Sequence, residues 1–327
     1  MLNITISKYP IPIIWLDTSA LINITRGRLN TSEEDKRYIS LADTIYRAVW
    51  NSKLICPQVD QMEEITRSFS EVQKTISLLS RGIHFRHGSD IKEIQMQNAM
   101  LAYINKTNVI EINYQDAFEK DPSTDQSKNN GMIIDIYGIK SGRLLQKERY
   151  KKSNYLAQLN ALRRMQREKR ISFAEQVKEE LTGEYQAALE VQKIWSRVYS
   201  GLHYPSEEEL SQISVFKSMV HFWNLLGGNP PDLEGFLEFL HSPEWKATPC
   251  NDIPANLFAK LITNSGPIED GDPKDVNHLT VALPYCHYIV CDKKMRNLVK
   301  ELKLNSKYNA QVFSIADVDD IIHAISE

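Results

Sequence analysis

Four acidic residues of this chain stand where carboxylates from distant parts of the sequence could meet. Asp17 and Asp292 each follow a short apolar run, while Glu64 and Asp275 lie on segments predicted to be helical. Carboxylates that converge on one cleft repel each other, and a bound cation relieves that repulsion; hard oxygen ligands select Mg²⁺ or Mn²⁺. Such an ion activates a water molecule and stabilises charge on a phosphodiester. The acids therefore predict metal-dependent hydrolysis of a nucleic acid.

Each of these acids also has an ordinary structural interpretation. An Asp after a strand is often a helix N-cap, which applies to Asp17 and equally to Asp275. Glu63 and Glu64 could belong to a solvated helix face, and Asp292 could be a turn residue before two lysines. The prediction therefore depends on the joint occurrence of these acids at the ends of predicted elements.

Two buried strands are predicted to position the aspartates. Residues 11–16 and 287–291 form apolar runs, which suit strands of a parallel sheet that is buried on both faces. Thr18 and Ser19 follow the first run and are good helix starters, so Asp17 is expected at the carboxyl end of a central strand. Catalytic groups of open α/β sheets collect at that edge.

The order of predicted elements indicates an α/β fold with a central parallel sheet flanked by helices. Further strands are predicted at residues 53–56 and 310–313. Helices are predicted at residues 33–51, from Pro57 onward, weakly over 70–127, and at 144–200, 232–241, 254–263, 275–282 and 293–302. Because the strands lie at both ends of the chain, we expect a discontinuous core of residues 1–70 and 250–327. A large, mostly helical insertion or cap would then occupy residues 71–249.

The predicted insertion contains a block of positive charge. Residues 128–170 hold twelve basic and three acidic side chains, a local excess of nine, although the whole chain has a formal net charge of −3. Arginines suited to bidentate phosphate contacts recur there at helical spacing: Arg163, Arg164, Arg167 and Arg170. Aromatic side chains that could stack on unpaired bases lie nearby: Tyr150, Tyr155 and Phe173. We expect this segment to bind nucleic acid, the alternative being a solvated, charge-rich helix.

Composition argues against a membrane-embedded or disordered chain. Hydrophobic residues make up 42% and charged residues 25%, which is ordinary for a globular protein. No apolar stretch approaches the length of a membrane span, and the N-terminus lacks the basic region of a signal peptide. The four cysteines form no CxxC pair and no zinc-finger spacing, so buried thiols are expected. These features predict a soluble, cytoplasmic protein.

Four segments resemble the motifs of PIN-domain nucleases. Residues 13–20 (IIWLDTSA) resemble the opening strand with its acidic ligand, and residues 56–65 (CPQVDQMEEI) resemble the next strand and the helix that bears the second acid. Residues 275–285 (DVNHLTVALPY) resemble the D-x-x-H...LPY variant of the third motif, and residues 289–292 (IVCD) the final acidic motif. The resemblance leaves out the middle of the chain and implies a PIN-like sheet.

The resemblance implies that Asp17, Glu64, Asp275 and Asp292 are the catalytic residues and bind Mg²⁺ or Mn²⁺, with Glu63 the alternative to Glu64. The sequence departs from the family pattern at two positions close to these acids. A thiol, Cys291, replaces the usual hydroxyl residue, and a histidine, His287, stands where an acid is expected.

Two further residues near the third motif could take part. His278 follows Asp275 by one helical turn and could orient a carboxylate or contact substrate phosphate. The alternative for His278 is a buried histidine bonded to the backbone. Asp272 is interpreted as a loop residue rather than an auxiliary acid.

The main hypothesis is a Mg²⁺- or Mn²⁺-dependent nuclease. RNA is favoured over DNA as the substrate, because most PIN-like proteins are ribonucleases. The alternatives are a non-catalytic PIN-like module that binds nucleic acid or protein, and a structure-specific DNA nuclease. The sequence leaves a homodimer open and indicates no membrane partner.

Overall fold

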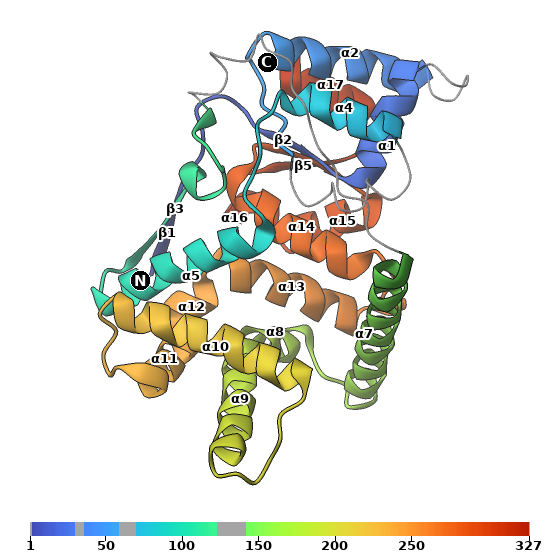
Figure 1. Ribbon diagram of the computed structural model, residues 1–327. Helices are drawn as coiled ribbons and strands as arrows, with labels where there is room; N and C mark the ends of the chain where they lie inside the picture. Colours follow the sequence, from blue (N-terminus) through green and yellow to red (C-terminus); the bar gives the residue numbers. More distant parts are fainter. Residues whose placement is uncertain (1, 30–35, 59–69, 123–141, 327) are drawn as a thin grey trace.

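The computed structural model describes residues 2–29, 36–58, 70–122 and 142–326, with backbone alone for residues 142–153. A small parallel sheet lies in the upper part of Figure 1 between two layers of helices, and further helices form the lower part. The chain is thus a mostly helical α/β protein, which confirms the predicted fold class at that level.

The larger sheet is parallel and has the strand order β2-β4-β5, with β2 at Ile14–Leu16, β4 at Tyr288–Cys291 and β5 at Gln311–Ser314. Single parallel bridges, Ile13 to Ile55 and Gln58 to His84, extend it beyond β2. β2, β4 and β5 confirm three of the predicted strands, while the strand predicted at residues 53–56 is reduced to the single bridge at Ile55.

Alternation along the strands explains why both faces of this sheet are buried. Ile14, Leu16 and Val290 belong to one hydrophobic cluster, and Trp15 and Ile289 belong to the other. Successive strand residues point to opposite faces, so a continuous apolar run serves two cores at once. The first core is formed with α1 (Thr18–Leu29), α2 (Arg37–Trp50), α4 (Ser70–Ser80) and α17 (Val318–Ser326).

The second core joins the other face of the sheet to the helical part of the chain (Figure 1). Its helices near the sheet are α14 (Asp272–Tyr285), α15 (Lys293–Glu301) and α16 (Leu304–Lys307). Those farther away are α5 (Gly88–Ile104), α9 (Gly183–Tyr199), α10 (Glu207–Leu225), α11 (Asp232–His241), α12 (Pro243–Ala247) and α13 (Pro249–Thr263). Two charged helices complete this part: α7 (Gly142–Glu168) and α8 (Phe173–Leu181).

A second, two-stranded parallel sheet was missed in the sequence. It pairs β1 (Asn3–Ser7) with β3 (Val109–Asn113), and a single 3-10 turn follows at Tyr114–Asp116. The prediction of helix over residues 70–127 is therefore wrong at β3. This pairing joins the first residues of the expected core to the expected insertion, and one hydrophobic cluster includes side chains from both.

Two of the predicted helices begin earlier in the sequence than expected. The helix predicted at residues 275–282 begins earlier, at Asp272, and the one predicted at 254–263 begins at Pro249. The helix predicted from Pro57 onward falls on residues 59–69, outside the described part.

All four cysteines are free thiols, three of them buried. Within the described ranges, no helix is long and apolar enough to cross a membrane.

Candidate active site

The topology of the larger sheet brings two of the predicted acids to one edge. Leu16 of β2 lies opposite Val290 of β4, so Asp17 and Asp292 both follow at the carboxyl ends of neighbouring parallel strands. After β2, the bridged residues Ile55 and His84 extend the sheet on one side of β2. The later strand β4 pairs with β2 on its other side. The order of strands thus reverses between β2 and β4. In open α/β sheets, ligands bind outside the carboxyl ends of the strands at such a point.

Asp17 is a buried carboxylate that also caps a helix. Its Oδ1 accepts hydrogen bonds from the N–H of Ala20 at 2.8 Å and from Ser19 Oγ at 2.7 Å, at the start of α1. Burial, with a smaller contribution from the charge of Asp292, raises the pKa of Asp17 to about 6 against the opposing effect of these hydrogen bonds. The N-cap interpretation of Asp17 is confirmed.

Asp292 plays the same capping role at the neighbouring strand. Its Oδ1 accepts hydrogen bonds from the backbone N–H groups of Lys294 at 2.6 Å and Met295 at 3.0 Å, at the start of α15. The helix dipoles of α1 and α15 therefore both begin at this edge and favour negative charge there. The two helix N-termini thus stabilise the two carboxylates at this edge.

We expect Asp292→Asn to keep this cap and Asp292→Ala to lose it. Asn ranks with Asp as an N-cap, whereas Ala removes the acceptor, which typically costs about 1 kcal/mol of stability. Urea denaturation should therefore show a free energy of unfolding lower by about that amount for the Ala variant than for the Asn variant. Equal stabilities would contradict a capping role for Asp292.

The buried thiol of Cys291 lies in the electric field of three of the predicted acids. Cys291 ends β4 and is 2% exposed. Burial is the main reason that the pKa of this thiol is raised well above its ordinary value, and the charges of Asp17, Asp292 and Asp275 add to that effect. Asp275 lies in the first turn of α14 rather than at its N-cap, because the helix begins at Asp272. Three carboxylates distant in sequence thus act on one thiol at the sheet edge.

The donor set at this edge suits a hard divalent cation that binds together with substrate. Among the described side chains, no group of three or more His, Cys, Asp or Glu is arranged to hold a metal ion. Glu64 and its alternative, Glu63, lie outside the described residues. Mg²⁺ often binds through only one or two carboxylates, with water and substrate phosphate completing its shell. The carboxylates of Asp17 and Asp292 are oxygen ligands of the type that Mg²⁺ prefers.

Two ion pairs at the same edge were missed in the sequence. Asp272 is 3% exposed, and both of its carboxylate oxygens accept hydrogen bonds from Lys294 Nζ at 2.7 Å, so the interpretation of Asp272 as a loop residue is wrong. Asp317 accepts hydrogen bonds from Arg296 at 2.5 Å and from the N–H of Ser314 at 2.9 Å. Because Ser314 ends β5, the rule that polar groups collect at strand ends would have selected Ser314 and Asp317.

The two histidines of this region lie in different surroundings. His278 follows Asp275 on α14, and its ring centroid is 5.5 Å from that of Trp15. His287 precedes β4, where its Nδ1 accepts a hydrogen bond from the N–H of Ile13 at 3.1 Å. Burial lowers the pKa of His287 to about 4, so the ring is neutral near pH 7. The residue at the position where the resemblance expects an acid therefore lies away from the acidic edge.

The predicted arginine face on α7 is divided by the packing of that helix. Arg163 is buried and donates hydrogen bonds to the carbonyl oxygens of Asn264 and Ser265, just after α13. Arg164 and Arg167 are exposed on the helix, and Arg167 also donates a hydrogen bond to the carbonyl oxygen of Ser265 at 3.3 Å. Arg170 is exposed in the turn beyond the end of the helix. The prediction that all four arginines share one open helical face is therefore wrong for Arg163 and Arg170.

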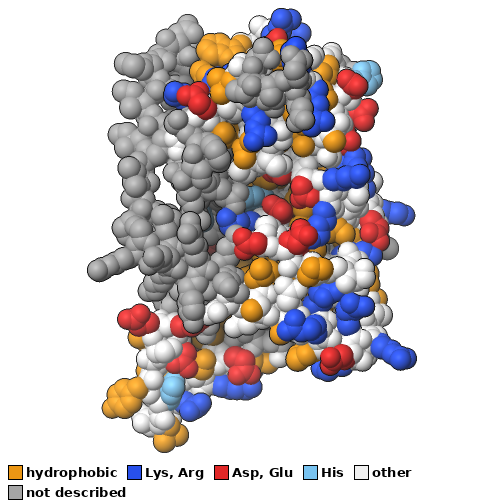
Figure 2. All heavy atoms as spheres, turned by 90° about the vertical axis from the view of Figure 1, so that its right-hand side faces the viewer, with side chains coloured by type: hydrophobic (Ala, Val, Ile, Leu, Met, Phe, Trp, Pro, Cys, Tyr) orange, Lys and Arg blue, Asp and Glu red, His pale blue; other side chains and the backbone are white. Residues whose placement is uncertain are grey.

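The arginine helix is fixed to the loop that leads to the acidic helix α14. Asn160 of α7 donates a hydrogen bond to the carbonyl of Ile268 and accepts one from its N–H, both at 3.0 Å. Figure 2 shows this side of the molecule, with acidic and basic side chains gathered at the height of α14 and α15 in Figure 1. Positive charge on α7 thus lies on a helix attached close to the acids.

Comparison of the chain with family models, curated proteins and solved structures gave no match. The fold and the edge described above define an α/β protein with acidic groups where its strand order reverses. The likeness to PIN-domain nucleases rests on the sequence motifs.

Proposed function

We propose that this protein is a Mg²⁺- or Mn²⁺-dependent nuclease of the PIN-like kind that hydrolyses phosphodiester bonds, with RNA as the favoured substrate. The observation that carries the proposal is the meeting of Asp17 and Asp292 at the reversal of strand order, with Asp275 acting on the same buried thiol. Capping alone accounts for Asp17 and Asp292, but it does not account for Asp275, a third acid whose charge acts on the same thiol.

Each residue of the site has a part in this proposal. Asp17, Asp292 and Asp275 would hold the cation, and the family resemblance adds Glu64 to this acidic set. The cation, when bound, lowers the pKa of an attacking water molecule and offsets charge on the phosphodiester. Lys294 lies beside the acids and is held by Asp272, where it can contact a substrate phosphate. His278 lies one turn from Asp275 and could bind the same phosphate.

RNA is favoured over DNA by the family resemblance alone, and the exposed arginines support the binding of either polymer. The family resemblance implies ribonucleases, and the exposed arginines Arg164, Arg167 and Arg170 provide guanidinium groups on the part of the molecule fixed next to α14. Arginine binds phosphate oxygens through two parallel hydrogen bonds, whatever the base sequence. Nucleic acid would then lie along α7 and enter the acidic edge from that side.

Replacement of Asp275 tests the proposal at an acid that caps no helix. With Mn²⁺, the wild-type protein should cleave RNA, and EDTA should abolish cleavage. Asp275→Asn should reduce the cleavage rate about 100-fold or more, which corresponds to about 3 kcal/mol of lost transition-state stabilisation. Asp43→Asn, at an exposed position on α2 in the opposite layer, is the matched control and should cleave normally.

Three outcomes would contradict the proposal in distinguishable ways. Full activity of Asp275→Asn would remove that acid from the site. Mn²⁺ binding in calorimetry without cleavage of any substrate would indicate the non-catalytic binding module. Cleavage of DNA flaps or single-stranded DNA with RNA left intact would indicate a DNA nuclease.

A further inference from the structure

The helical hairpin of α9 and α10 is packed on only a small part of its surface. Both helices lie wholly within the described residues, α9 with 17 residues and α10 with 19, yet each buries only two side chains: Ala188 and Val191 on α9, Ile213 and Trp223 on α10. The stability of helices in proteins comes mainly from the packing of an apolar face. In Figure 1 the lower end of α9 and the loop after it project below the other helices. The hairpin therefore has surface left for a partner.

Large hydrophobic side chains are exposed where this hairpin projects. Tyr199 ends α9 and is 86% exposed, and the loop that follows holds Leu202, 77% exposed, and Tyr204, 95% exposed. An ion pair between His203 and Glu209 at 3.0 Å connects the same loop to α10. Single exposed hydrophobic residues are common, but a group of them on one projection marks an interaction surface. Tyr199, Leu202 and Tyr204 are called the tip below.

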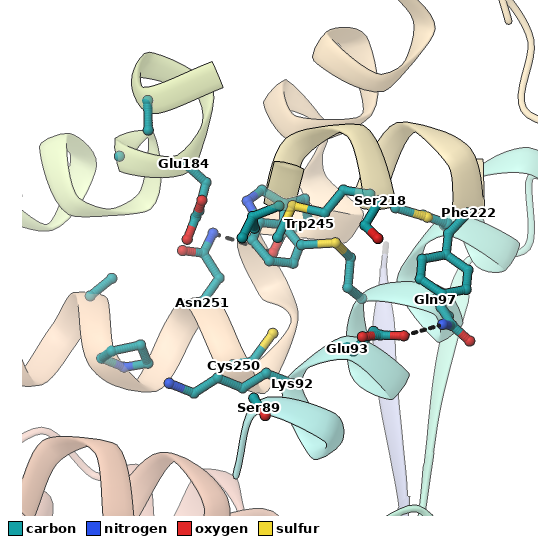
Figure 3. A pocket seen from close by; sticks show the side chains of 18 of the residues that line it. Ser89, Lys92, Glu93, Gln97, Glu184, Ser218, Phe222, Trp245, Cys250 and Asn251 are labelled. Atoms are coloured by element: carbon teal, nitrogen blue, oxygen red, sulfur yellow. Dashed lines mark hydrogen bonds between the residues drawn. The ribbon is translucent and has the colours of Figure 1, made fainter. Parts of the chain in front are cut away.

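An apolar groove of about 220 Å³ lies beside the tip, between α9 and α10. Trp195 lines it, one helical turn before Tyr199 and on the same face of α9. The groove lies on the opposite face of α10 from a larger cavity, shown in Figure 3, which Ser218 and Phe222 line. Small-molecule sites have volumes of about 300 to 1,000 Å³, so this groove is better matched to a few side chains of a protein.

The charges of the groove and of the tip have opposite signs. Lys217 lies in the groove wall with its ammonium group 3.7 Å from the centroid of the Trp195 ring, and no described carboxylate forms an ion pair with it. Asp232, a carboxylate in the same wall, already accepts a hydrogen bond from Asn224 at 3.0 Å. Beside the tip, Glu207 begins α10, is exposed and forms no ion pair with a described residue. A second copy of the chain can supply each of these two charges with a partner.

These features favour a second copy over other partners. The first turn of α10 is acidic, with Glu207, Glu208 and Glu209, and it repels nucleic acid and anionic lipid headgroups. Because tip and groove belong to one hairpin, a two-fold axis brings the tip of each copy to the groove of the other and forms every contact twice. An aromatic side chain covers about 150 to 250 Å². The tip thus provides several hundred Å² per copy, which is typical of weak, reversible interfaces.

We propose that this protein forms a two-fold symmetric dimer through α9 and α10. The tip of each copy packs in the groove of the other, and Glu207 of one copy pairs with Lys217 of the other. The dimer is independent of the proposed nuclease chemistry.

Analytical ultracentrifugation of the intact chain at micromolar concentrations tests the inference. Wild type should dimerise reversibly with a dissociation constant in the micromolar range. Tyr204→Ser should raise that constant about tenfold or more, because it removes an aromatic contact of the tip. Since Tyr204 is 95% exposed, its replacement should leave the free energy of unfolding unchanged. Leu225→Ser, at a 67% exposed position of α10 outside the groove wall, is the matched control and should dimerise normally.

Reversal of the two charges shows whether Glu207 and Lys217 meet across the interface. Lys217→Glu and Glu207→Lys each bring like charges together at two symmetric contacts and should raise the dissociation constant about tenfold. The double variant restores opposite charges and should dimerise nearly as well as wild type. A monomer at all concentrations, single reversals without effect, or a double variant as weak as the single ones would overturn the inference. Monomeric protein that binds vesicles of phosphatidylcholine and phosphatidylserine, and loses that binding in Tyr204→Ser, would overturn it in favour of a membrane.

Discussion

Asp17→Asn is expected to stabilise the metal-free protein while it abolishes Mn²⁺-dependent cleavage. The pKa of Asp17 is raised from an ordinary value of 3.8 to about 6, chiefly by burial. A shift of about two pKa units corresponds to about 3 kcal/mol of unfavourable free energy for the charged form in the folded state. Asn keeps the oxygen that caps α1 and carries no charge, so it removes this cost.

The difference in stability between Asp17→Asn and wild type should depend on pH. Between about pH 4 and pH 6 the folded state binds a proton at Asp17 that the unfolded state has already released, so the stability contributed by this group falls as pH rises. The gain of Asp17→Asn over wild type should therefore be absent below pH 4, grow through this window, and approach about 3 kcal/mol above pH 6. Urea denaturation in EDTA at several pH values measures it, with Asp43→Asn as the control.

Added Mn²⁺ should reverse the order of stability if Asp17 is a ligand. A ligand that binds only the folded state stabilises it by about 4.1 kcal/mol at 1,000 times its dissociation constant, which exceeds the advantage of the Asn variant in EDTA. Wild type should gain stability with Mn²⁺ and the Asn variant should not. A variant that is less stable than wild type at pH 7.5 in EDTA, or one that gains as much from Mn²⁺, would contradict a cation site at Asp17.

The position of Asp17 in the sequence explains why its charge should destabilise the metal-free protein. An apolar strand buried on both faces ends directly at Asp17, so the carboxylate is desolvated by the same packing that fixes its position. Active-site groups are often unfavourable for stability because function, and not folding, requires them there. The charge of Asp292 on the neighbouring strand adds to that cost in the absence of a cation.

Periodicity explains which elements could be predicted from the sequence. Residues 11–16 and 287–291 were identified as strands because fully buried strands leave continuous apolar runs. β3 has the sequence VIEIN and alternates between exposed and buried residues, but the surrounding helical segments concealed a pattern only five residues long. β1 is similar, and its polar residues Asn3, Thr5 and Ser7 gave no sign that a partner strand would come from residue 109 onward.

Side-chain partners in the site could be predicted less well than strand ends. The rule that acids gather at the carboxyl ends of parallel strands selects Asp17 and Asp292 without knowledge of any contact. The bond between Asp272 and Lys294 depends on how α14 packs beside α15, which no local pattern encodes. Arg163 has the spacing of an exposed arginine, and it is buried because the loop after α13 crosses this point of α7.

Charge reversal of the exposed arginines should weaken nucleic-acid binding strongly, with only the long 3.3 Å hydrogen bond from Arg167 to the carbonyl oxygen of Ser265 lost from the fold. We expect the triple variant Arg164→Glu, Arg167→Glu, Arg170→Glu to bind single-stranded RNA with a reduced dependence on salt. Each phosphate contact contributes about 0.7 to the slope of log K against log salt for single strands, so loss of three contacts lowers the slope by about 2. Fluorescence anisotropy at several salt concentrations measures this slope.

Arg163 is left out of that variant because its guanidinium group stabilises the fold. Loss of its hydrogen bonds to the carbonyl oxygens of Asn264 and Ser265 should cost on the order of 2 kcal/mol and would confuse unfolding with loss of binding. Arg197→Glu, an exposed reversal on α9, is the matched control and should leave the slope unchanged. If the triple variant keeps the wild-type slope, RNA does not contact α7 through these arginines. If Arg197→Glu lowers the slope by as much as each reversal in the triple variant does, the loss of RNA binding reflects the net charge of the protein and not a binding face on α7.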